Sequence, residues 1–128
     1  MRNGVPADAL RWVMPRDSWL LNRANIQPGT QFAKTQRASI ASRMRAITDA
    51  SSLDDLFAAL EADQELLRLD PSVDPTMYHC AIVSLGELEQ LRSIKDVVRL
   101  GHIDTVEADH LMMRDGTVPV DVPSRIIR

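Results

Sequence analysis

The chain has 128 residues, of which 45% are hydrophobic and 26% charged, so it fits one small globular domain and is not disordered throughout. Its formal net charge of -3 gives no general attraction to nucleic acid, because such binding needs clustered cations that neutralise phosphates. The single cysteine, Cys80, excludes an intrachain disulfide and a zinc site built from four thiolates.

Membrane and secretory signals are not found in the sequence. Charges or prolines interrupt every apolar stretch well before the about 20 residues that span a bilayer. The first ten residues also lack the apolar run of a signal peptide. We therefore expect a cytoplasmic protein with no membrane partner.

The first expected element is a short buried strand from Leu10 to Met14, which ends at Pro15-Arg16-Asp17. Asn3-Gly4 ahead of it resembles the C-terminal end of a helix. The stretch from Asn22 to Gly29 is expected to be a loop, because it ends in a Pro-Gly turn signal.

Two helices should follow. From Thr30 to about Ile47 the apolar spacing is helical, and Ile40, Met44 and Ile47 form an apolar stripe that should face the core. The second helix begins after Ser52, whose hydroxyl can cap the free N–H groups of the first turn. Its apolar residues fall on one face and comprise Leu53, Leu56, Phe57 and Leu60.

The first of these helices also carries a run of cations with no acid before Asp49, namely Lys34, Arg37, Arg43 and Arg45. One interpretation is a surface that binds an anion or phosphate. The other is a solvated outer face opposite the apolar stripe. Ser39 and Ser42 on the same helix do not suggest nucleophiles, because no histidine lies nearby in the sequence.

The second half of the chain alternates strands and one helix. Leu66 to Leu69 and Met77 to Val83 are strand-like. Ser84-Leu85-Gly86-Glu87 is a capping box, and it should open a helix that runs to about Ile94. A strand at Val97 to Leu100 and a meander through residues 103–120, with a tight turn at Asp115-Gly116, complete the pattern.

Two groups of residues could bind a metal. His79 and Cys80 are adjacent on the expected strand, so their side chains should point to opposite faces and not share one ion. A second group gathers around the meander and comprises His102, Asp104, Glu107, Asp109 and His110. It is interpreted either as a chelating cluster or as solvated turn residues.

Arg16 is the candidate ligand-binding residue, because it directly follows the first strand. In a dinucleotide-binding fold the end of the second strand meets the adenine ribose, and an arginine there can pair with a 2′-phosphate. The alternative is a turn arginine bonded to Asp17 or to solvent. The five glycines are too widely spaced for the glycine-rich loop that cradles a pyrophosphate, and Trp12 and Trp19 are interpreted as packing anchors.

Five stretches of the sequence carry a family likeness. The longest covers residues 3–20 and includes Leu10-Arg11-Trp12-Val13-Met14-Pro15-Arg16-Asp17. The other four are Arg23-Ala24-Asn25-Ile26-Gln27-Pro28, Leu67-Arg68-Leu69-Asp70-Pro71, Glu87-Leu88-Glu89-Gln90-Leu91-Arg92 and Val97-Val98-Arg99-Leu100-Gly101. They resemble stretches of NAD(P)- and FAD-dependent oxidoreductases, of the flavin-containing monooxygenase and pyridine nucleotide-disulfide oxidoreductase type. The terminal meander resembles a β-insertion of these enzymes.

The resemblance implies an α/β fold, with a partial Rossmann-like nucleotide-binding domain, a helical insertion and a terminal three-stranded β-meander. We expect a single truncated domain over residues 1–128. Its parts would be a nucleotide-domain strand at 5–21, the helical insertion at 30–64, mixed α/β structure at 66–100, the meander at 101–120 and an aberrant tail at 121–128.

The resemblance also implies FAD and NADP as cofactors of the intact family, and Arg16 as a contact to the 2′-phosphate. The two glycine fingerprints of the family have no match here. We therefore expect an internal fragment of an oxidoreductase that binds no flavin alone, is inactive alone, and leaves an unpaired edge at the strand from Leu10 to Met14.

A different class of function is also open. The chain could be a small non-enzymatic interaction or regulatory module that docks on a partner through the amphipathic helix 30–47, and it would then fold cooperatively by itself. A third class, nucleic-acid binding through the basic helix, is disfavoured by the net charge of -3.

Overall fold

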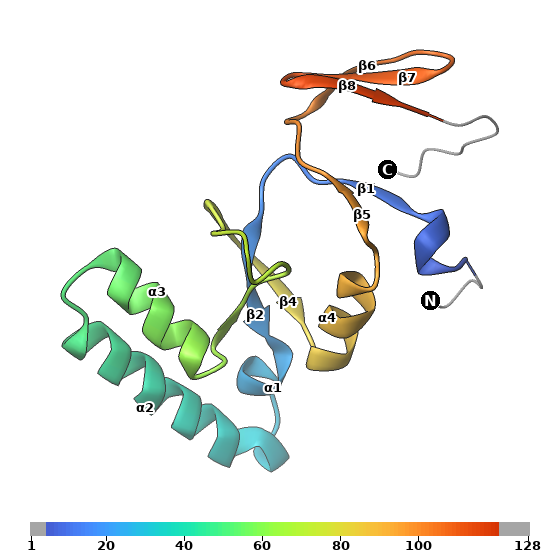
Figure 1. The fold of residues 1–128 in the computed structure, drawn as a ribbon. Coiled ribbons are helices and arrows are strands. Elements are labelled where there is room, and N and C mark those ends of the chain that lie inside the picture. The colour runs from blue at the N-terminus through green and yellow to red at the C-terminus, as the bar shows by residue number, and fades with distance from the viewer. Residues whose placement is uncertain (1–4, 121–128) are drawn as a thin grey trace. The chain divides into compact units, whose positions relative to one another are not determined.

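The computed structural model describes residues 5–120, which divide into two compact units (Figure 1). The first unit comprises residues 5–16 and 94–120, and the second comprises residues 17–93. Their strands form three small sheets, and the described chain is mixed α/β. The helix end expected at Asn3-Gly4 and the tail at 121–128 lie outside the described residues.

The second unit is built on a three-stranded sheet. Strand β2 (Ser18–Asn22) lies between β3 (Leu66–Leu67), to which it is antiparallel, and β4 (Met77–Val83), to which it is parallel. The range of β4 confirms the strand expected from sequence. Strand β2 was not foreseen as a separate element, because its three apolar residues are too few for a periodic pattern, yet it is the central strand.

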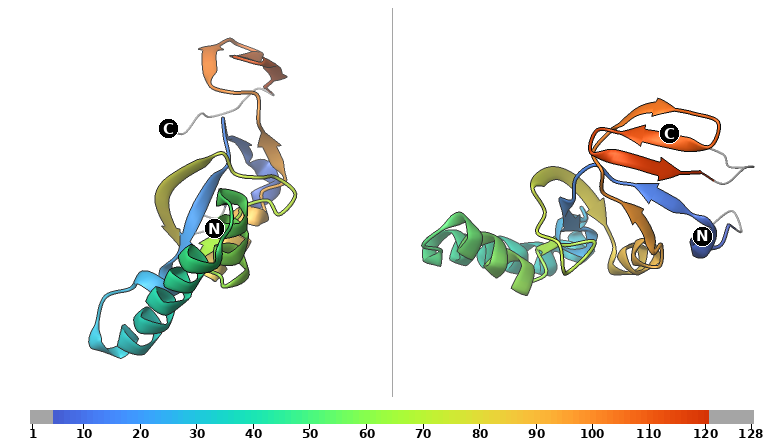
Figure 2. Two further views of the ribbon diagram at one scale, coloured as in Figure 1. Left: turned by 90° about the vertical axis from the view of Figure 1, so that its left-hand side faces the viewer. Right: turned by 45° about the horizontal axis from the view of Figure 1, so that its top comes forward.

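Four helices belong to the second unit, and Figures 1 and 2 show them from three directions. They are α1 (Arg23–Ile26), α2 (Ala33–Asp49), α3 (Leu53–Ala62) and α4 (Leu85–Arg92), with a 3-10 turn η2 (Thr30–Phe32) ahead of α2. Helix α1 interrupts the segment expected to be a loop. The helix expected at 30–47 is confirmed and extends to Asp49.

The helix starts follow from capping side chains. The Asn22 side chain accepts a hydrogen bond from the Ala24 amide at 3.1 Å, and the Ser52 hydroxyl accepts one from the Asp55 amide at 3.1 Å. Such bonds satisfy amide donors that a helix leaves free at its N-terminus. The local sequence therefore fixes where α1 and α3 begin.

Trp19 anchors the core of the second unit. Its ring stacks on Phe57 of α3 with centroids 5.3 Å apart and an interplanar angle of 12°, and the Arg68 guanidinium lies over it at 5.4 Å. The expectation that Trp19 is a packing anchor is confirmed. The other buried apolar residues of this unit are Ala46, Leu66, Leu67, Leu69 and Leu88.

The apolar stripe of α2 does not face the core, which corrects the sequence expectation. Ile40, Met44 and Ile47 are 58%, 55% and 57% exposed. The buried residues of this helix are instead Ser39, Ser42 and Ala46. The two serines donate hydrogen bonds to Glu65 and Asp63, which follow the end of α3. These bonds determine which face of α2 is buried.

The first unit joins segments far apart in the sequence. Strand β1 (Arg11–Val13) pairs in parallel with β5 (Asp96–Val98), and a 3-10 turn η1 (Ala7–Ala9) precedes β1. Arg11 Nε donates to the Asp96 carboxylate at 2.7 Å across this pair. Within residues 5–120, β5 is the one strand paired with β1.

The rest of the first unit is the expected three-stranded meander, formed by β6 (Ile103–Val106), β7 (His110–Met113) and β8 (Gly116–Pro119). Both pairings are antiparallel, and Figure 2 shows the meander from two further directions. Its core consists of Leu111, Met113 and Val118. Four partly buried residues pack against this core: Val13 of β1, Val98 of β5, Leu100 and Val120. Among the helices described in both units, none has the length and apolarity needed to cross a membrane.

Candidate functional site

Arg16 lies in the short segment between β1 and β2. Its side chain is exposed, and within residues 5–120 it forms no hydrogen bond or ion pair, so it does not pair with Asp17. Strand β1 runs parallel to β5, and Arg16 follows the carboxyl end of β1. Ligands of open α/β sheets bind at the carboxyl ends of parallel strands. This position leaves the guanidinium free to contact a phosphate.

The strand-to-helix turns of the described chain do not fit a pyrophosphate. Such a turn needs glycines that let the phosphates reach backbone N–H groups at a helix N-terminus. Gly86 is the one glycine that follows a strand at such a turn, and it lies within α4, where a side chain would meet nothing within 4 Å. It therefore forms no close backbone cradle.

The N-terminus of α4 is also occupied by its own side chains. Glu87 accepts hydrogen bonds from the Ser84 amide at 2.7 Å and the Ser84 hydroxyl at 2.9 Å, and the hydroxyl accepts one from the Glu87 amide at 3.2 Å. These bonds, the backbone bond first, lower the pKa of Glu87. The capping box is confirmed, and a carboxylate already holds the place an anion would take. The N-terminus of α4 therefore offers no free amide cradle for a pyrophosphate.

His79 and Cys80 form a bulge in β4. Trp19 pairs with Tyr78 and Leu20 pairs with Ala81, so the two residues between them have no partner on β2. Cys80 adopts a φ of 54°, which is rare for a residue other than glycine. The simple alternation assumed from sequence is therefore broken here. Among the described residues, no group of three or more metal-ligating side chains comes together, at this bulge or around His102 and His110.

His110, at the start of β7, has a neighbouring carboxylate as its partner. His110 Nδ1 lies 2.6 Å from the Asp109 carboxylate. This hydrogen bond, with the charge of the histidine, lowers the pKa of Asp109. Both residues stand at the start of β7, where the pair stabilises a turn.

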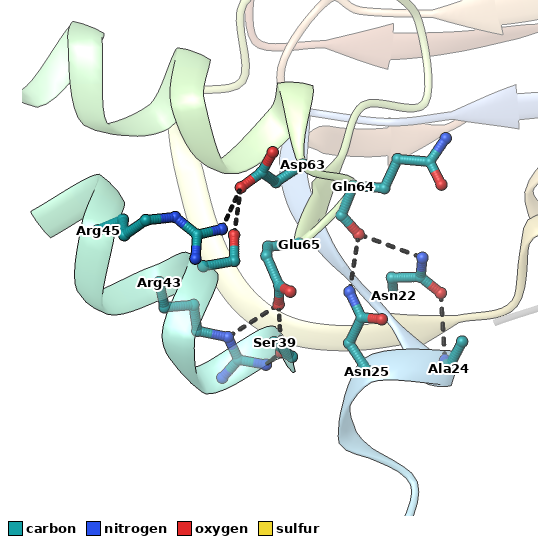
Figure 3. A network of polar contacts seen from close by, with 10 residues as sticks. Asn22, Ala24, Asn25, Ser39, Arg43, Arg45, Asp63, Gln64 and Glu65 are labelled. Atoms are coloured by element: carbon teal, nitrogen blue, oxygen red, sulfur yellow. Dashed lines mark hydrogen bonds and ion pairs between the residues drawn. The ribbon is translucent and has the colours of Figure 1, made fainter. Parts of the chain in front are cut away.

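The cations of α2 separate into two that lie near carboxylates, Arg43 and Arg45, and two that have none nearby among the described residues, Lys34 and Arg37. Arg43 points inward: its Nε donates to Glu65 at 2.8 Å and its Nη2 donates to the Ser39 hydroxyl at 2.9 Å (Figure 3). Arg45 Nη2 lies 3.9 Å from Asp63. Lys34 and Arg37 are exposed. The four cations therefore form neither one anion site nor one solvated face opposite the stripe.

Glu65 is the centre of the polar contacts in Figure 3. It is only 4% exposed, and it accepts a hydrogen bond from the Ser39 hydroxyl at 2.7 Å in addition to that from Arg43. Ser42 donates similarly to Asp63. Both serines thus tie α2 to carboxylates that follow α3.

Next to this network lies an apolar hollow of about 230 Å³. Leu21, Phe57, Leu60 and Leu66 form its apolar walls, and Arg43, Glu65 and Tyr78 complete its lining. Partial burial, followed by a hydrogen bond with Cys80, raises the pKa of Tyr78. Arg43 and Glu65 pair with each other, so the hollow can accept an apolar group but presents no net charge to it. Sequence reasoning missed it because its lining comes from five separate elements.

The comparisons with known proteins give relatives but no function. The chain is 51% identical over 119 residues to an uncharacterized protein of Mycobacterium bovis and to uncharacterized proteins of two Mycobacterium tuberculosis strains. The match covers 93% of this chain, which spans only 22% of the length of each of these relatives. No protein-family profile matches the chain. No solved structure is similar to it.

Proposed function

We propose that this chain serves as a segment of a longer, cytoplasmic, flavin-dependent oxidoreductase that uses NAD(P)H, and that it has no catalytic activity by itself. The observation that carries the proposal is the match, over 93% of this chain, to proteins of which it spans only 22%. The resemblance of residues 3–20 and 97–101 to the oxidoreductase family supplies the reaction class. In such enzymes the cofactor provides the chemistry and the protein holds it in position.

Arg16 would contribute one contact in the longer protein. It is exposed, free of other partners among residues 5–120, and follows the carboxyl end of β1. A guanidinium there can bind a 2′-phosphate with charge-assisted hydrogen bonds. It would thereby favour NADP over NAD, while the pyrophosphate and the flavin would be held by residues outside the described chain.

The proposal can be tested in the mycobacterial relative and in a chimera. In the chimera, this chain replaces the matching segment of the Mycobacterium tuberculosis protein. We expect the relative and the chimera to purify with bound flavin and to oxidise NADPH, whereas this chain alone shows no visible flavin absorbance. A relative that binds no flavin even when FAD is supplied would contradict the proposal.

Arg16→Ala in the chimera tests the role of the arginine. Loss of a charged hydrogen bond of about 1.5 to 3 kcal/mol should raise the KM for NADPH by about 10- to 100-fold. The KM for NADH should change little, because NADH lacks the 2′-phosphate. Arg114→Ala, at an exposed cation in the turn between β7 and β8, is the matched control. Equal effects on both nucleotides would exclude the 2′-phosphate contact.

A non-enzymatic interaction module is the second candidate, and one observation favours it. The apolar stripe of α2 is exposed, as a docking helix requires. This candidate predicts that the chain by itself melts in one cooperative transition and that the mycobacterial relative contains no flavin.

A further inference from the structure

The apolar stripe of α2 has the spacing of a helix-pairing surface. Ile40, Met44 and Ile47 are separated by four and three residues, which is the spacing of side chains that face a second helix. Each of the three is more than half exposed. A single exposed apolar residue is ordinary, whereas several on one face of a helix mark a surface that another element covers.

The orientation of α2 is fixed, so the stripe cannot turn inward. Ser39 and Arg43 both bind the buried Glu65, and Ser42 binds Asp63. Rotating the helix to bury Ile40 and Met44 would break these bonds and leave the Glu65 carboxylate unpaired in the interior, which is strongly unfavourable.

Cations border the stripe. Arg37 precedes Ile40 by three residues and Met44 by seven, so it shares their face, and Lys34 precedes Arg37 by one further turn. Both are exposed, and neither has an acidic partner within residues 5–120. Positive charge at the N-terminal end of a helix opposes its dipole, so these residues do not stabilise α2 itself. A partner with acidic side chains would complement them.

We propose that the apolar stripe of α2 is covered by a helix from the remaining polypeptide of the longer protein, and that this helix carries apolar residues at pairing distance and acidic residues beside Lys34 and Arg37. The inference rests on the part of the proposed function that makes this chain a segment of a longer protein, and it does not depend on flavin chemistry. The relatives provide ample chain for it, since 78% of their length lies outside the matched span.

A second copy of the chain or a lipid surface fits these residues less well. If two copies paired through the stripe, Lys34 and Arg37 of both copies would lie in one interface. No acidic side chain on that face of the helix would neutralise their charge. A helix that lies in a lipid surface usually has a wide apolar face with aromatic residues, and this stripe has three aliphatic side chains.

Hydroxyl-radical footprinting measures whether the stripe is covered. We expect Met44 and Ile47 to be oxidised readily in this chain alone and several-fold more slowly in the chimera. Leu53, which is exposed and lies outside the stripe, is the control, and its oxidation rate should differ less between the two proteins. The same protection should appear at the aligned residues of the unmodified mycobacterial relative, so a chimera that does not fold leaves the test intact. Equal oxidation of the stripe in the longer protein would overturn the proposal, and protection only with added vesicles would point to lipid.

Charge reversal tests the acidic border of the covering helix. Arg37→Glu should lower the melting temperature of the chimera by several degrees and leave that of this chain nearly unchanged. Arg114→Glu, at an exposed cation in the turn between β7 and β8, should change neither. If Arg37→Glu has the same effect on both proteins, no acidic partner lies there. Footprinting and melting need no cofactor, so either result stands whether or not the relative binds flavin.

Discussion

At the residue scale, Glu65 decides how α2 lies on the second unit. Its carboxylate is buried and is held by Ser39 and Arg43 on successive turns of α2. Among the described residues no buried side-chain polar atom lacks a partner. An acid directly before Leu66 is inconspicuous in the sequence, because acids in this position are usually solvated. Its role became visible only when its two partners were placed beside it.

We predict that Glu65→Gln destabilises the chain. Ser39 and Arg43 both donate to Oε2 of Glu65. A neutral amide oxygen in that place is a weaker acceptor for the Arg43 guanidinium than a carboxylate oxygen, so the free energy of unfolding should fall by about 1 to 3 kcal/mol. Urea denaturation followed by circular dichroism measures this change. Glu107→Gln, at an exposed glutamate, is the control and should alter stability by less than about 0.5 kcal/mol. Equal stability of the two variants would show that the buried contact contributes nothing.

At the scale of the element, local signals were reliable and the hydrophobic pattern was not. Caps at Ser52 and Ser84 were readable from sequence because a cap bonds within its own first turn. The face that α2 buries was misassigned, because periodicity marks an apolar face without telling what covers it. Here polar bonds decided the orientation, and the apolar stripe was left outside.

The capping box of α4 predicts a measurable pH dependence. The pKa of Glu87 is lowered in the folded chain, mainly by the Ser84 amide and then by its hydroxyl. The stability that Glu87 contributes is therefore complete above the pKa of an unfolded glutamate, and it is lost as the pH falls through the lowered folded value. Ser84→Ala should move the Glu87 pKa toward its ordinary value and reduce stability by about 1 kcal/mol.

An NMR titration of the Glu87 side-chain carboxyl carbon checks this shift. Ser93→Ala, at the other end of α4, removes a hydroxyl that bonds to Gln90 and should leave the Glu87 pKa where it is. If the serine at position 84 has no influence on the titration, the capping box does not form in solution.

At the scale of the whole molecule, the first unit is assembled from both ends of the described chain. Arg11 and Asp96, which join β1 to β5, are separated by 85 residues in the sequence. No local pattern encodes which strands pair at such a distance. The meander is the opposite case: its turns and strands are neighbours in sequence, and it was expected correctly.

Two glycines provide a test of the two units. Gly101, in the first unit, has a φ of 74°, and a Cβ there would lie 2.9 Å from Asp115 Oδ2. Gly101→Ala should therefore destabilise the meander by about 1 to 2 kcal/mol. Gly86→Ala, in α4 of the second unit, meets no atom within 4 Å and should stabilise that helix by about 0.5 to 1 kcal/mol.

Amide hydrogen exchange separates these effects. Gly101→Ala should speed exchange at Leu111 and Val118, whereas Gly86→Ala should slow it at Leu88. If Gly101→Ala speeds exchange equally in both units, they do not open independently.

By itself the sequence determined the positions of α3, α4 and β4, the meander, and Arg16 at the end of β1, because bonds and periodicities within a few residues specify them. The tertiary structure alone decided that β2 is a central strand, that Arg43 points inward to Glu65, and that Ile40, Met44 and Ile47 face outward. These outcomes depend on pairing and on burial of charge between segments far apart in the chain. The free energy of a buried carboxylate without its partners exceeds that of exposing three aliphatic side chains, so the polar bonds set the orientation of the helix.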